Sequence, residues 1–500
     1  MKNIKFALTA VAFLAMTTSY TSSYATTNNT EAEKKDNPPL DEKTRAFYDK
    51  CNNLNDNEAC FKLGDAYDDC EGVKKDFQQA NKYYLKACDM NNSKGCNNLG
   101  FSYEKGHGVR QDFQQANKYY LKACDMNNGL GCTNLGLSYV EGHGVKQDFQ
   151  KANKYYQKAC DMNNGPGCFN LGLNYYTRDK NYHQANQYFQ KACDLNNGDG
   201  CFKLGFAYNR GKGIRQDFQQ ANKYYQKACD MNNGQGCTNL GISYDEGHGV
   251  KQDFQKANKY YQKACDMNNG HGCNNLGVSY DEGHGVKQDF QKANKYYQKA
   301  CDMNNSHGCA NLGFSYDEGH GVKQDFQKAN KYYQKACDMN NGHGCANLGF
   351  SYDEGHGVKQ DFQKANKYYQ KACDMNNGQG CNNLGVSYRK GQGVRQDFLQ
   401  ANKYYLKACD MNNGQGCTNL GLSYVEGHGV RQDFQQAMYY YRKACDLKDA
   451  IGCYNIGFNY DDGRGVKRNK STAKWYFDKA CELGYQEGCD DYRKLNEQGY

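Results

Sequence analysis

The sequence predicts an all-α fold, an α-solenoid superhelix of about twelve disulfide-clipped helix-hairpin repeats. Three observations predict it. Thirteen cysteine pairs run through the 500 residues, and nearly every pair recurs 36 residues after the previous one. Within each copy, apolar residues recur three and four positions apart, as they do on one face of a helix. Only 3 prolines occur in the chain, so few positions interrupt a helix. Tandem copies of this length are typical of solenoids, which grow along one axis around a continuous core.

The N-terminal 40 residues carry no repeat. Two lysines precede an apolar run, Phe6 to Met16, which is too short to span a bilayer. The small residues that follow predict cleavage after Ala25, so 1–25 is interpreted as a signal peptide. The polar segment 26–40 is predicted to be a flexible linker. No later segment is suited to crossing a membrane, and we expect a secreted or periplasmic protein.

The repeat that begins at Cys96 illustrates the first helix of a hairpin. This helix is predicted over 96–105, where Leu99 and Tyr103 lie on one side, four positions apart. Gly100 has a counterpart in every full repeat, although glycine weakens a helix by about 1 kcal/mol. Its recurrence therefore indicates that two helices approach each other closely there.

The second helix is predicted over 113–125, after a Gly-x-Gly loop at 106–109. Asp112 precedes it, where a carboxylate can accept hydrogen bonds from the first free N–H groups and face the positive end of the helix dipole. An apolar stripe at helical spacing begins at Phe113. The segment 125–131 is expected to turn into the next repeat, with its glycines in the left-handed conformation that ends a helix.

The paired cysteines join consecutive hairpins. Cys124 closes one hairpin and Cys132 opens the next, so the sulfurs can meet across the turn. Each ring of about nine residues contributes roughly 2–3 kcal/mol in the chain-entropy model. Zinc, the alternative ligand of paired cysteines, needs four ligands at tighter spacing, and no metal site is predicted. Disulfides, and with them an oxidising compartment, are expected between Cys51 and Cys60, Cys88 and Cys96, Cys124 and Cys132, Cys160 and Cys168, Cys193 and Cys201, Cys229 and Cys237, Cys265 and Cys273, Cys301 and Cys309, Cys337 and Cys345, Cys373 and Cys381, Cys409 and Cys417, Cys445 and Cys453, and Cys481 and Cys489.

The repeat resembles the Sel1-like repeat, a relative of the tetratricopeptide repeat. The resemblance is carried by Leu99-Gly100, Tyr103, Gly106-His107-Gly108-Val109, Asp112, Ala116, Tyr119-Tyr120 and Lys122-Ala123. With Cys124-Asp125 and Gly131-Cys132 added, it looks like the disulfide-clipped subgroup called Helicobacter cysteine-rich proteins. The resemblance implies a right-handed superhelix of antiparallel helix pairs that acts as an extracytoplasmic interaction scaffold. Members of this subgroup have also been classed as penicillin-binding proteins or β-lactamases, so β-lactam binding or weak hydrolysis is the alternative function that it implies.

The ends of the solenoid and two irregular positions depart from the pattern. The solenoid is predicted over 41–489, with an N-terminal cap helix at 41–51 and a polar C-terminal cap at 490–500. The unit from Cys168 to Gly200 is three residues short and lacks the Gly-x-Gly loop. Cys70 stands where other repeats place the first loop glycine and is predicted to be an exposed free thiol. It is either an inert substitution or a thiol that forms an intermolecular bond or reacts.

A polar ladder on the first helices is the candidate binding site. Asparagine follows the second cysteine of most pairs by two residues, serine follows four residues later, and both are predicted to face away from the core in a concave groove. Asparagine donates and accepts, so the ladder can hold the backbone of an extended peptide; the alternative is a ladder that bonds only to neighbouring helices. The apolar residue three positions after the asparagine, such as Phe101, is assigned to packing between repeats. The candidate residues are Asn98, Ser102, Asn134, Ser138, Asn239, Ser243, Asn275, Ser279, Asn311, Ser315, Asn347, Ser351, Asn383, Ser387, Asn419 and Ser423.

Other chemistry receives little support from the sequence. Ser471-Thr472-Ala473-Lys474 fits the Ser-x-x-Lys motif of serine β-lactamases, but the Ser-Asp-Asn and Lys-Thr-Gly motifs are missing from the sequence, so no catalytic residue is assigned. The net charge of +8 is spread over a mixed surface and does not indicate nucleic-acid binding. No cofactor is expected. Ten histidines are interpreted as polar loop and turn residues rather than metal ligands: His107, His143, His248, His284, His320, His356, His428, His271, His307 and His343. The favoured function is a scaffold that binds a protein or peptide in its groove.

Overall fold

The computed structural model describes residues 40–500 and consists there of 26 α-helices, with no strand among the described residues. The predicted signal peptide (1–25) and the predicted linker up to residue 39 lie outside the described residues. The described chain forms two compact units: residues 40–95 with 107–109, and residues 96–106 with 110–500. The prediction of an all-α solenoid of hairpin repeats is confirmed.

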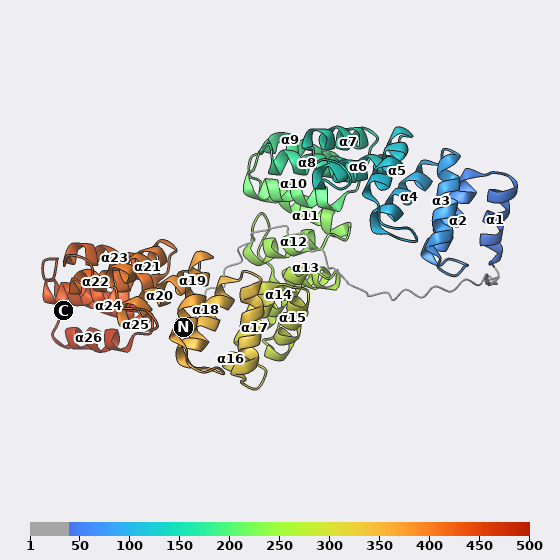
Figure 1. Cartoon of the computed structure of the whole chain (residues 1–500). Helices are drawn as coiled ribbons and strands as arrows, with labels where there is room; N and C mark the ends of the chain where they lie inside the picture. The colour runs from blue at the N-terminus through green and yellow to red at the C-terminus, as the bar shows by residue number, and fades with distance from the viewer. Residues whose placement is uncertain (1–39) are drawn as a thin grey trace. The chain divides into compact units, whose positions relative to one another are not determined.

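The helices alternate in two roles: a first helix, or A helix, is followed by a second helix, or B helix, and the two lie side by side, as α6 and α7 do (Figure 1). Helix α1 (Glu42–Asn53) precedes the first hairpin. The A helices are α2 (Asn57–Asp69), α4 (Ser93–Lys105), α6 (Gly129–Glu141), α8 (Gly165–Thr177), α10 (Gly198–Arg210), α12 (Gly234–Glu246), α14 (Gly270–Glu282), α16 (Ser306–Glu318), α18 (Gly342–Glu354), α20 (Gly378–Lys390), α22 (Gly414–Glu426), α24 (Ala450–Asp462) and the terminal α26 (Gln486–Glu497). The B helices are α3 (Phe77–Asp89), α5 (Phe113–Asp125), α7 (Phe149–Asp161), α9 (Tyr182–Asp194), α11 (Phe218–Asp230), α13 (Phe254–Asp266), α15 (Phe290–Asp302), α17 (Phe326–Asp338), α19 (Phe362–Asp374), α21 (Phe398–Asp410), α23 (Phe434–Asp446) and α25 (Lys470–Glu482).

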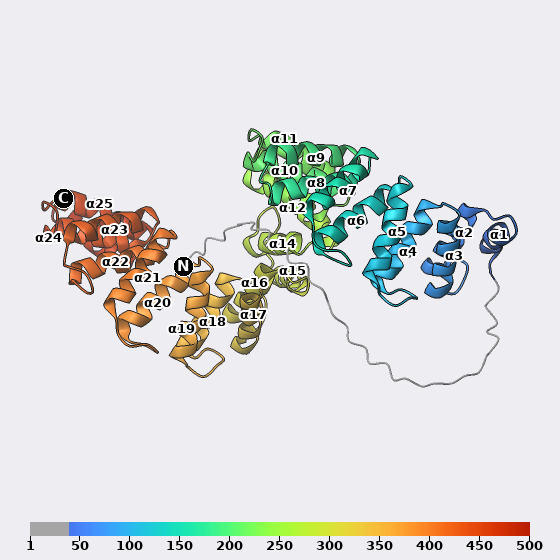
Figure 2. The same ribbon diagram turned by 45° about the horizontal axis from the view of Figure 1, so that its top comes forward.

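Both views of the ribbon show the same succession of hairpins in the larger unit (Figure 2). Each hairpin contacts the next through its B helix, which packs against the following A helix. No helix within residues 40–500 has both the length and the apolar character needed to span a membrane.

The B helices form where the sequence predicts them. In α5, the Asp112 carboxylate accepts hydrogen bonds from the backbone N–H groups of Gln114 and Gln115 and so caps the helix. Ala116 and Tyr120 are buried on the side that faces the A helix. The predicted bounds 113–125 are confirmed.

The A helices begin earlier than predicted, because the turn before them uses different residues. The left-handed residue is Asn127, with φ of 58°, and not a glycine. Asparagine tolerates this conformation because its short polar side chain can hydrogen-bond locally. The next residue, Asn128, caps α6 by accepting a hydrogen bond from Gly131 N at 2.9 Å. The helix therefore begins at Gly129, three residues before Cys132, and the expectation of left-handed glycines in this turn is wrong.

Glycines in the A helices permit close helix contact. A Cβ atom on Gly131 would lie 2.7 Å from Ala123 Cβ, on the preceding B helix. A Cβ atom on Gly136 would lie 2.6 Å from the ring of Tyr156, on the following B helix. Both distances are shorter than van der Waals contact, so each A helix is pressed against a B helix on both sides. The predicted close approach at the Gly100 position is confirmed: a Cβ there would lie 2.7 Å from the Tyr120 ring.

Disulfides clip the B helix of each repeat to the next A helix. Twelve of the predicted pairs have Cα–Cα distances of 4.5–4.7 Å. Cys88 and Cys96 each belong to a disulfide. Cys70 is an exposed free cysteine, as predicted, and ends α2 in the left-handed conformation with φ of 64°.

Substitution of Gly277 in α14 tests the close approach. A Cβ there would meet the Tyr297 ring at 2.6 Å, so we expect Gly277→Ala to lower the local unfolding free energy of α13–α15 by about 1–3 kcal/mol. Native-state hydrogen exchange measures this local quantity in a repeat protein.

The matched control is Gly270→Ala in the same helix. Other repeats carry Ser306 and Ala450 at this position, so the fold accommodates a Cβ atom there. We expect this variant to be as stable as the wild type or more so. Equal stability of the two variants would contradict the close-packing account.

Candidate protein-binding face

Each A helix exposes one stripe of side chains. In α18 the stripe consists of His343, Asn347, Phe350 and Glu354, which lie three or four positions apart and therefore on one side of the helix. Cys345 and Leu348, on the opposite side, are buried. We call the residues at these four positions of the A helices from α4 to α24 the A-face.

The A-face lies on the inner side of the local curvature in the larger unit. Consecutive A helices, such as α6 and α8 or α12 and α14, contact each other. Consecutive B helices in residues 110–500 make no contact of similar extent. Elements on the inner side of a curved stack lie closer together, so the A-face turns toward the inside of the bend between neighbouring repeats.

The predicted asparagines lie on the A-face and are partly exposed. Several of them also contact the neighbouring repeat: the side-chain N–H groups of Asn134, Asn311 and Asn419 donate to Oδ1 of Asn97, Asn274 and Asn382 at 2.8–3.0 Å. Asn239 instead donates to the backbone oxygen of Gln235 at 2.9 Å. These asparagines thus combine contacts to protein with a partly exposed side chain.

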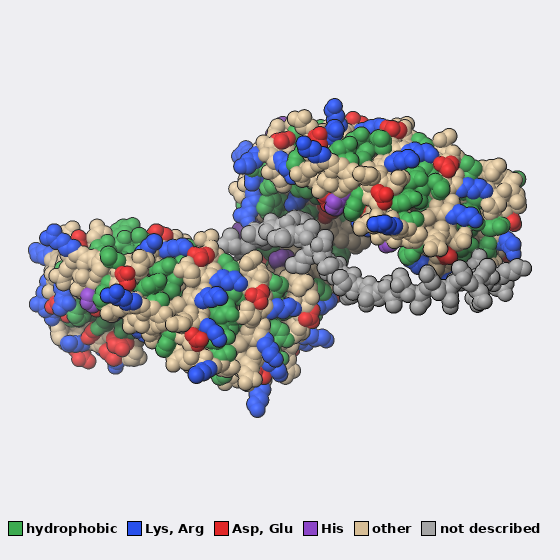
Figure 3. Space-filling model, in the orientation of Figure 1, with side chains coloured by type: hydrophobic (Ala, Val, Ile, Leu, Met, Phe, Trp, Pro, Cys, Tyr) green, Lys and Arg blue, Asp and Glu red, His purple; other side chains and the backbone are tan. Residues whose placement is uncertain are grey.

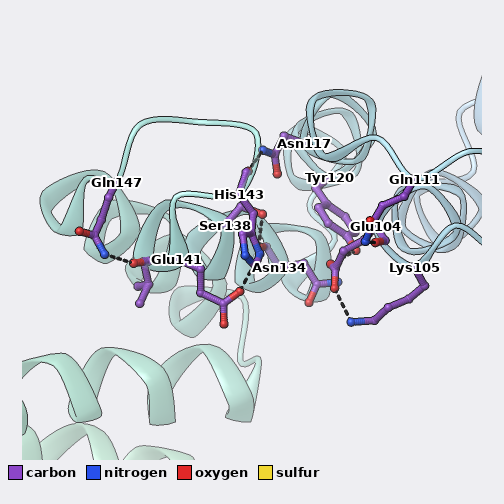
Figure 4. Close-up of polar contacts among 11 residues, drawn as sticks. Glu104, Lys105, Gln111, Asn117, Tyr120, Asn134, Ser138, Glu141, His143 and Gln147 are labelled. Carbon is purple, nitrogen blue, oxygen red and sulfur yellow. Dashed lines mark hydrogen bonds and ion pairs between the residues drawn. The ribbon is translucent and has the colours of Figure 1, made fainter. Parts of the chain in front are cut away.

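The predicted serines do not lie on a surface. All eight have side chains that are only 2–7% exposed. Ser138, for example, donates its hydroxyl hydrogen to the backbone oxygen of Asn134 at 3.2 Å, four residues earlier (Figure 4). Each serine follows its asparagine by four residues but packs toward the preceding B helix. The expectation of a serine row in the groove is therefore corrected for Ser102, Ser138, Ser243, Ser279, Ser315, Ser351, Ser387 and Ser423.

An apolar row replaces the serines on the A-face. The residue three positions after the asparagine is partly exposed in every repeat from α4 to α24. Phe101, Leu137 and Phe350 are 42%, 39% and 43% exposed. From the sequence, this position was assigned to packing between repeats, and the partial exposure of its side chains was not predicted. The position lies three residues after the asparagine, and in a helix this spacing places both side chains on the same side. That spacing was the feature of the sequence that indicated the exposure. The row comprises Phe101, Leu137, Leu173, Phe206, Ile242, Val278, Phe314, Phe350, Val386, Leu422 and Phe458.

The loop histidines contact residues of the neighbouring repeat. The ring of His143 stacks on Phe113 of the preceding repeat with 4.6 Å between centroids. Its backbone oxygen accepts a hydrogen bond from the Asn117 side chain at 2.7 Å, and its Nδ1 lies 3.0 Å from the Glu141 carboxylate (Figure 4). No cluster of three or more His, Cys, Asp or Glu side chains able to hold a metal ion occurs between residues 40 and 500.

Carboxylates at the end of the A helices contact buried tyrosines. Glu104 accepts a hydrogen bond from the Tyr120 hydroxyl at 2.7 Å and forms an ion pair with Lys105 at 2.6 Å (Figure 4). In α12 the equivalent residue, Asp245, accepts from Tyr261 at 3.1 Å. Partial burial raises the pKa of Asp245 above its ordinary value, because desolvation disfavours the charged form.

The surface that Figure 3 shows is chemically mixed. In the view of Figure 3, lysine and arginine side chains alternate with acidic and apolar ones. In the Ser471-x-x-Lys474 segment on α25, the lysine is directed to the C-terminus of the chain. Its ammonium donates to Asn496 Oδ1 at 2.6 Å and to the backbone oxygen of Tyr500 at 2.5 Å.

A buried asparagine on most of the B helices leads to a stability prediction. Asn258 donates to His284 O at 2.7 Å, but its Oδ1 is buried and accepts no hydrogen bond from a described residue. In the short repeat, asparagine replaces the serine, and Asn174 donates to Asn153 Oδ1 at 2.8 Å. Asn459 occupies the same position beside a full-length loop and is 3% exposed, where it donates to the sulfur of Met438, which replaces the B-helix asparagine in that repeat.

We expect Ser279→Asn to raise the local unfolding free energy of α13–α14 by about 1 kcal/mol, because the new amide would donate to Asn258 Oδ1. Hydrogen exchange of these two helices checks this, with Ser279→Ala as the control that adds no donor. A loss of stability in Ser279→Asn relative to Ser279→Ala would show that the Asn258 oxygen is not available to the amide.

Comparison with known proteins supports the fold assignment. Twelve consecutive copies of the Sel1 repeat match residues 57–485 without a gap. Among solved structures, a protective antigen with an SLR fold from uropathogenic Escherichia coli, c5321, shares 25% identity at a TM-score of 0.60, over 91% of this chain and 97% of that chain. Cysteine rich protein B of Helicobacter pylori shares 38% identity over 27% of this chain and 96% of its own, at a TM-score of 0.23.

A Sel1 repeat protein from Oxalobacter formigenes shares 24% identity over 49% of this chain and 96% of that chain, at a TM-score of 0.44. No curated protein sequence matches the chain.

The many disulfides indicate a non-reducing, extracytoplasmic environment. Sel1 repeats form scaffolds that typically mediate protein–protein interaction. Since the twelve matches cover well over half of the sequence, the chain belongs to the Sel1 repeat family.

Proposed function

We propose that this protein is a secreted or periplasmic scaffold that binds proteins or peptides through its A-face. The observation that carries the proposal is the row of partly exposed apolar side chains at one position of consecutive A helices. Single exposed apolar residues are ordinary on a protein surface, whereas an ordered apolar row with polar neighbours is typical of an interaction site.

The asparagines beside this row supply polar contacts. An amide side chain has two donors and an acceptor with two lone pairs. Asn134 uses one donor on Asn97, which leaves bonding capacity for a ligand backbone at its partly exposed edge. Apolar contacts flanked by amides are suited to an extended polypeptide, in which side chains alternate with backbone polar groups.

The secreted or periplasmic location is part of the proposal. Its support is the cysteine pairing, since disulfides persist in oxidising compartments, together with the sequence interpretation of residues 1–25.

The proposed function is tested by comparing the affinity of captured partners for the wild-type protein and for a variant that lacks part of the apolar row. The oxidised wild-type protein is compared with a Phe314→Ser/Phe350→Ser variant, and with a Lys331→Ser/Lys367→Ser control that changes exposed positions on the B helices of the same two repeats. We expect a partner that binds the wild type and the control with equal Kd, and binds the phenylalanine variant at least about tenfold more weakly, because hot spots are buried aromatic anchors.

Circular dichroism confirms that each variant is folded. Partners that bind the phenylalanine variant as tightly as the wild type, and lose affinity for the lysine control, would move the binding site to the B helices and overturn the proposal.

A further inference from the structure

The A-face changes charge along the chain. Four consecutive A helices, α12, α14, α16 and α18, end in an Asp-Glu pair and contain no lysine or arginine. The A helix before them, α10, ends in Arg210, and the one after them, α20, ends in Arg389-Lys390. The acidic stretch therefore covers four repeats and is bounded at both ends by basic residues.

The two carboxylates of each pair have different surroundings. The aspartates are held by the core: Asp281 and Asp317 accept hydrogen bonds from the hydroxyls of Tyr297 and Tyr333 at 3.0 and 3.1 Å. The glutamates lie on the A-face itself, seven positions after the asparagine and four after the apolar residue. The Glu246 side chain is 44% exposed.

Two of these glutamates contact a histidine of the loop that follows them. His248 and His284 contact Glu246 and Glu282 at 3.0 and 3.5 Å. The lysines in the first turn of the B helices form ion pairs with the capping aspartate of their own helix, as Lys292 does with Asp289 at 3.5 Å. At the other end of the A-face, desolvation by neighbouring atoms lowers the pKa of His271, His307 and His343, which favours their neutral form.

The apolar row continues through the same four repeats. Ile242 and Val278 are followed by Phe314 and Phe350, whose rings meet His320 and His356 edge-on at 5.7 and 5.8 Å. Each repeat thus presents one apolar side chain with one exposed carboxylate one helical turn away. A ligand that fits must offer apolar groups and positive charges at the spacing of the repeats.

The spacing selects an extended polypeptide. Packed helices lie about 10 Å apart, and an extended or polyproline chain advances roughly 3.1–3.3 Å per residue. Every third residue of such a chain therefore meets the same position of the next repeat. Four repeats correspond to about twelve residues.

We propose that the A-face of α12, α14, α16 and α18 binds an extended cationic segment of a partner protein, with lysine or arginine at every third position and apolar residues between them. This inference rests on the proposed function and names the chemistry of its partner. The basic residues Arg210, Arg389 and Lys390 disfavour further positive charge beyond the four repeats, which fixes the length and position of the segment.

Synthetic peptides test the inference on the full-length, oxidised protein. The probe has twelve residues, capped ends, lysine at every third position and leucine before each lysine. Two control peptides replace lysine by glutamate or shuffle the lysine spacing. We expect saturable binding of the probe alone, measured by calorimetry, with a Kd that rises with salt because rim charges are screened.

Two matched variants locate the site. Glu246→Gln/Glu282→Gln/Glu318→Gln/Glu354→Gln is expected to weaken binding of the probe about tenfold or more. The control, Asp266→Asn/Asp302→Asn/Asp338→Asn/Asp374→Asn, removes four exposed carboxylates at the ends of the B helices in the same repeats and is expected to bind like the wild type.

A third variant extends the acidic stretch. Arg389→Asp/Lys390→Glu gives α20 the Asp-Glu ending of the preceding A helices. The matching probe has fifteen residues, because one more repeat corresponds to about three more residues of an extended chain. We expect the variant to bind this longer probe more tightly than the wild type does. Equal affinity of the wild type and the glutamate variant for the probe, or binding of the glutamate peptide, would overturn the inference. The proposed function would survive that result if captured partners still require Phe314 and Phe350.

Discussion

The close contact between the end of each B helix and the start of the next A helix is the constraint on which the rest of the structure depends. Gly131 lies against Ala123, and the Cys124–Cys132 disulfide holds the same two helices with 4.6 Å between Cα atoms. Asn127 supplies the left-handed residue between them. Because the same contact recurs at each junction, the same side of each A helix faces the same direction relative to its neighbour, and the A-face becomes a row.

Polar and aromatic contacts between helices take the place of much of the aliphatic packing found in other protein cores. The chain has 44 tyrosines and only 38% apolar residues. One aromatic side chain of each B helix is buried against the glycine of the A helix; it is phenylalanine in α9 and α25 and tyrosine in the others. Burial raises the pKa of Tyr225 to about 12. Its neighbour Tyr224 stacks on Tyr208 with 5.6 Å between centroids and donates its hydroxyl hydrogen to Gln190 of the preceding repeat at 2.6 Å. Since these contacts join helices of the same repeat or of adjacent repeats, stability is built from neighbour to neighbour.

Local chemistry in the sequence was sufficient for most of the fold. The capping aspartates, the 36-residue period and the paired cysteines predicted the B helices and the disulfides. The start of the A helices was missed because Gly-x-Gly after two asparagines looks like a turn, whereas Asn127 makes the turn and Gly129 and Gly131 are helical. Only the position of the neighbouring Ala123 and Cys124 explains why glycine is required at position 131.

The candidate site was predicted only in part, because here too the outcome depends on contacts between neighbouring repeats. The helical wheel placed asparagine and serine on one side, but serine lies four residues on, beside the B-helix asparagine of the preceding repeat, and is buried. Which flank of an A helix the preceding hairpin covers depends on the angle between repeats, which no single repeat encodes. The apolar position, such as Phe350, lies on the uncovered flank and is the residue that sequence reasoning assigned to packing.

Hydrogen exchange of a Cys265→Ser/Cys273→Ser variant tests this account most directly, because it removes one clip and leaves the other repeats unchanged. The account predicts faster exchange in the last turn of α13, the first turn of α14 and the turn between them, with the exchange of α20 to α24 unaltered. Unchanged exchange at this junction, or loss of protection along the whole chain at once, would contradict the claim that each disulfide-clipped contact orients only its own pair of repeats.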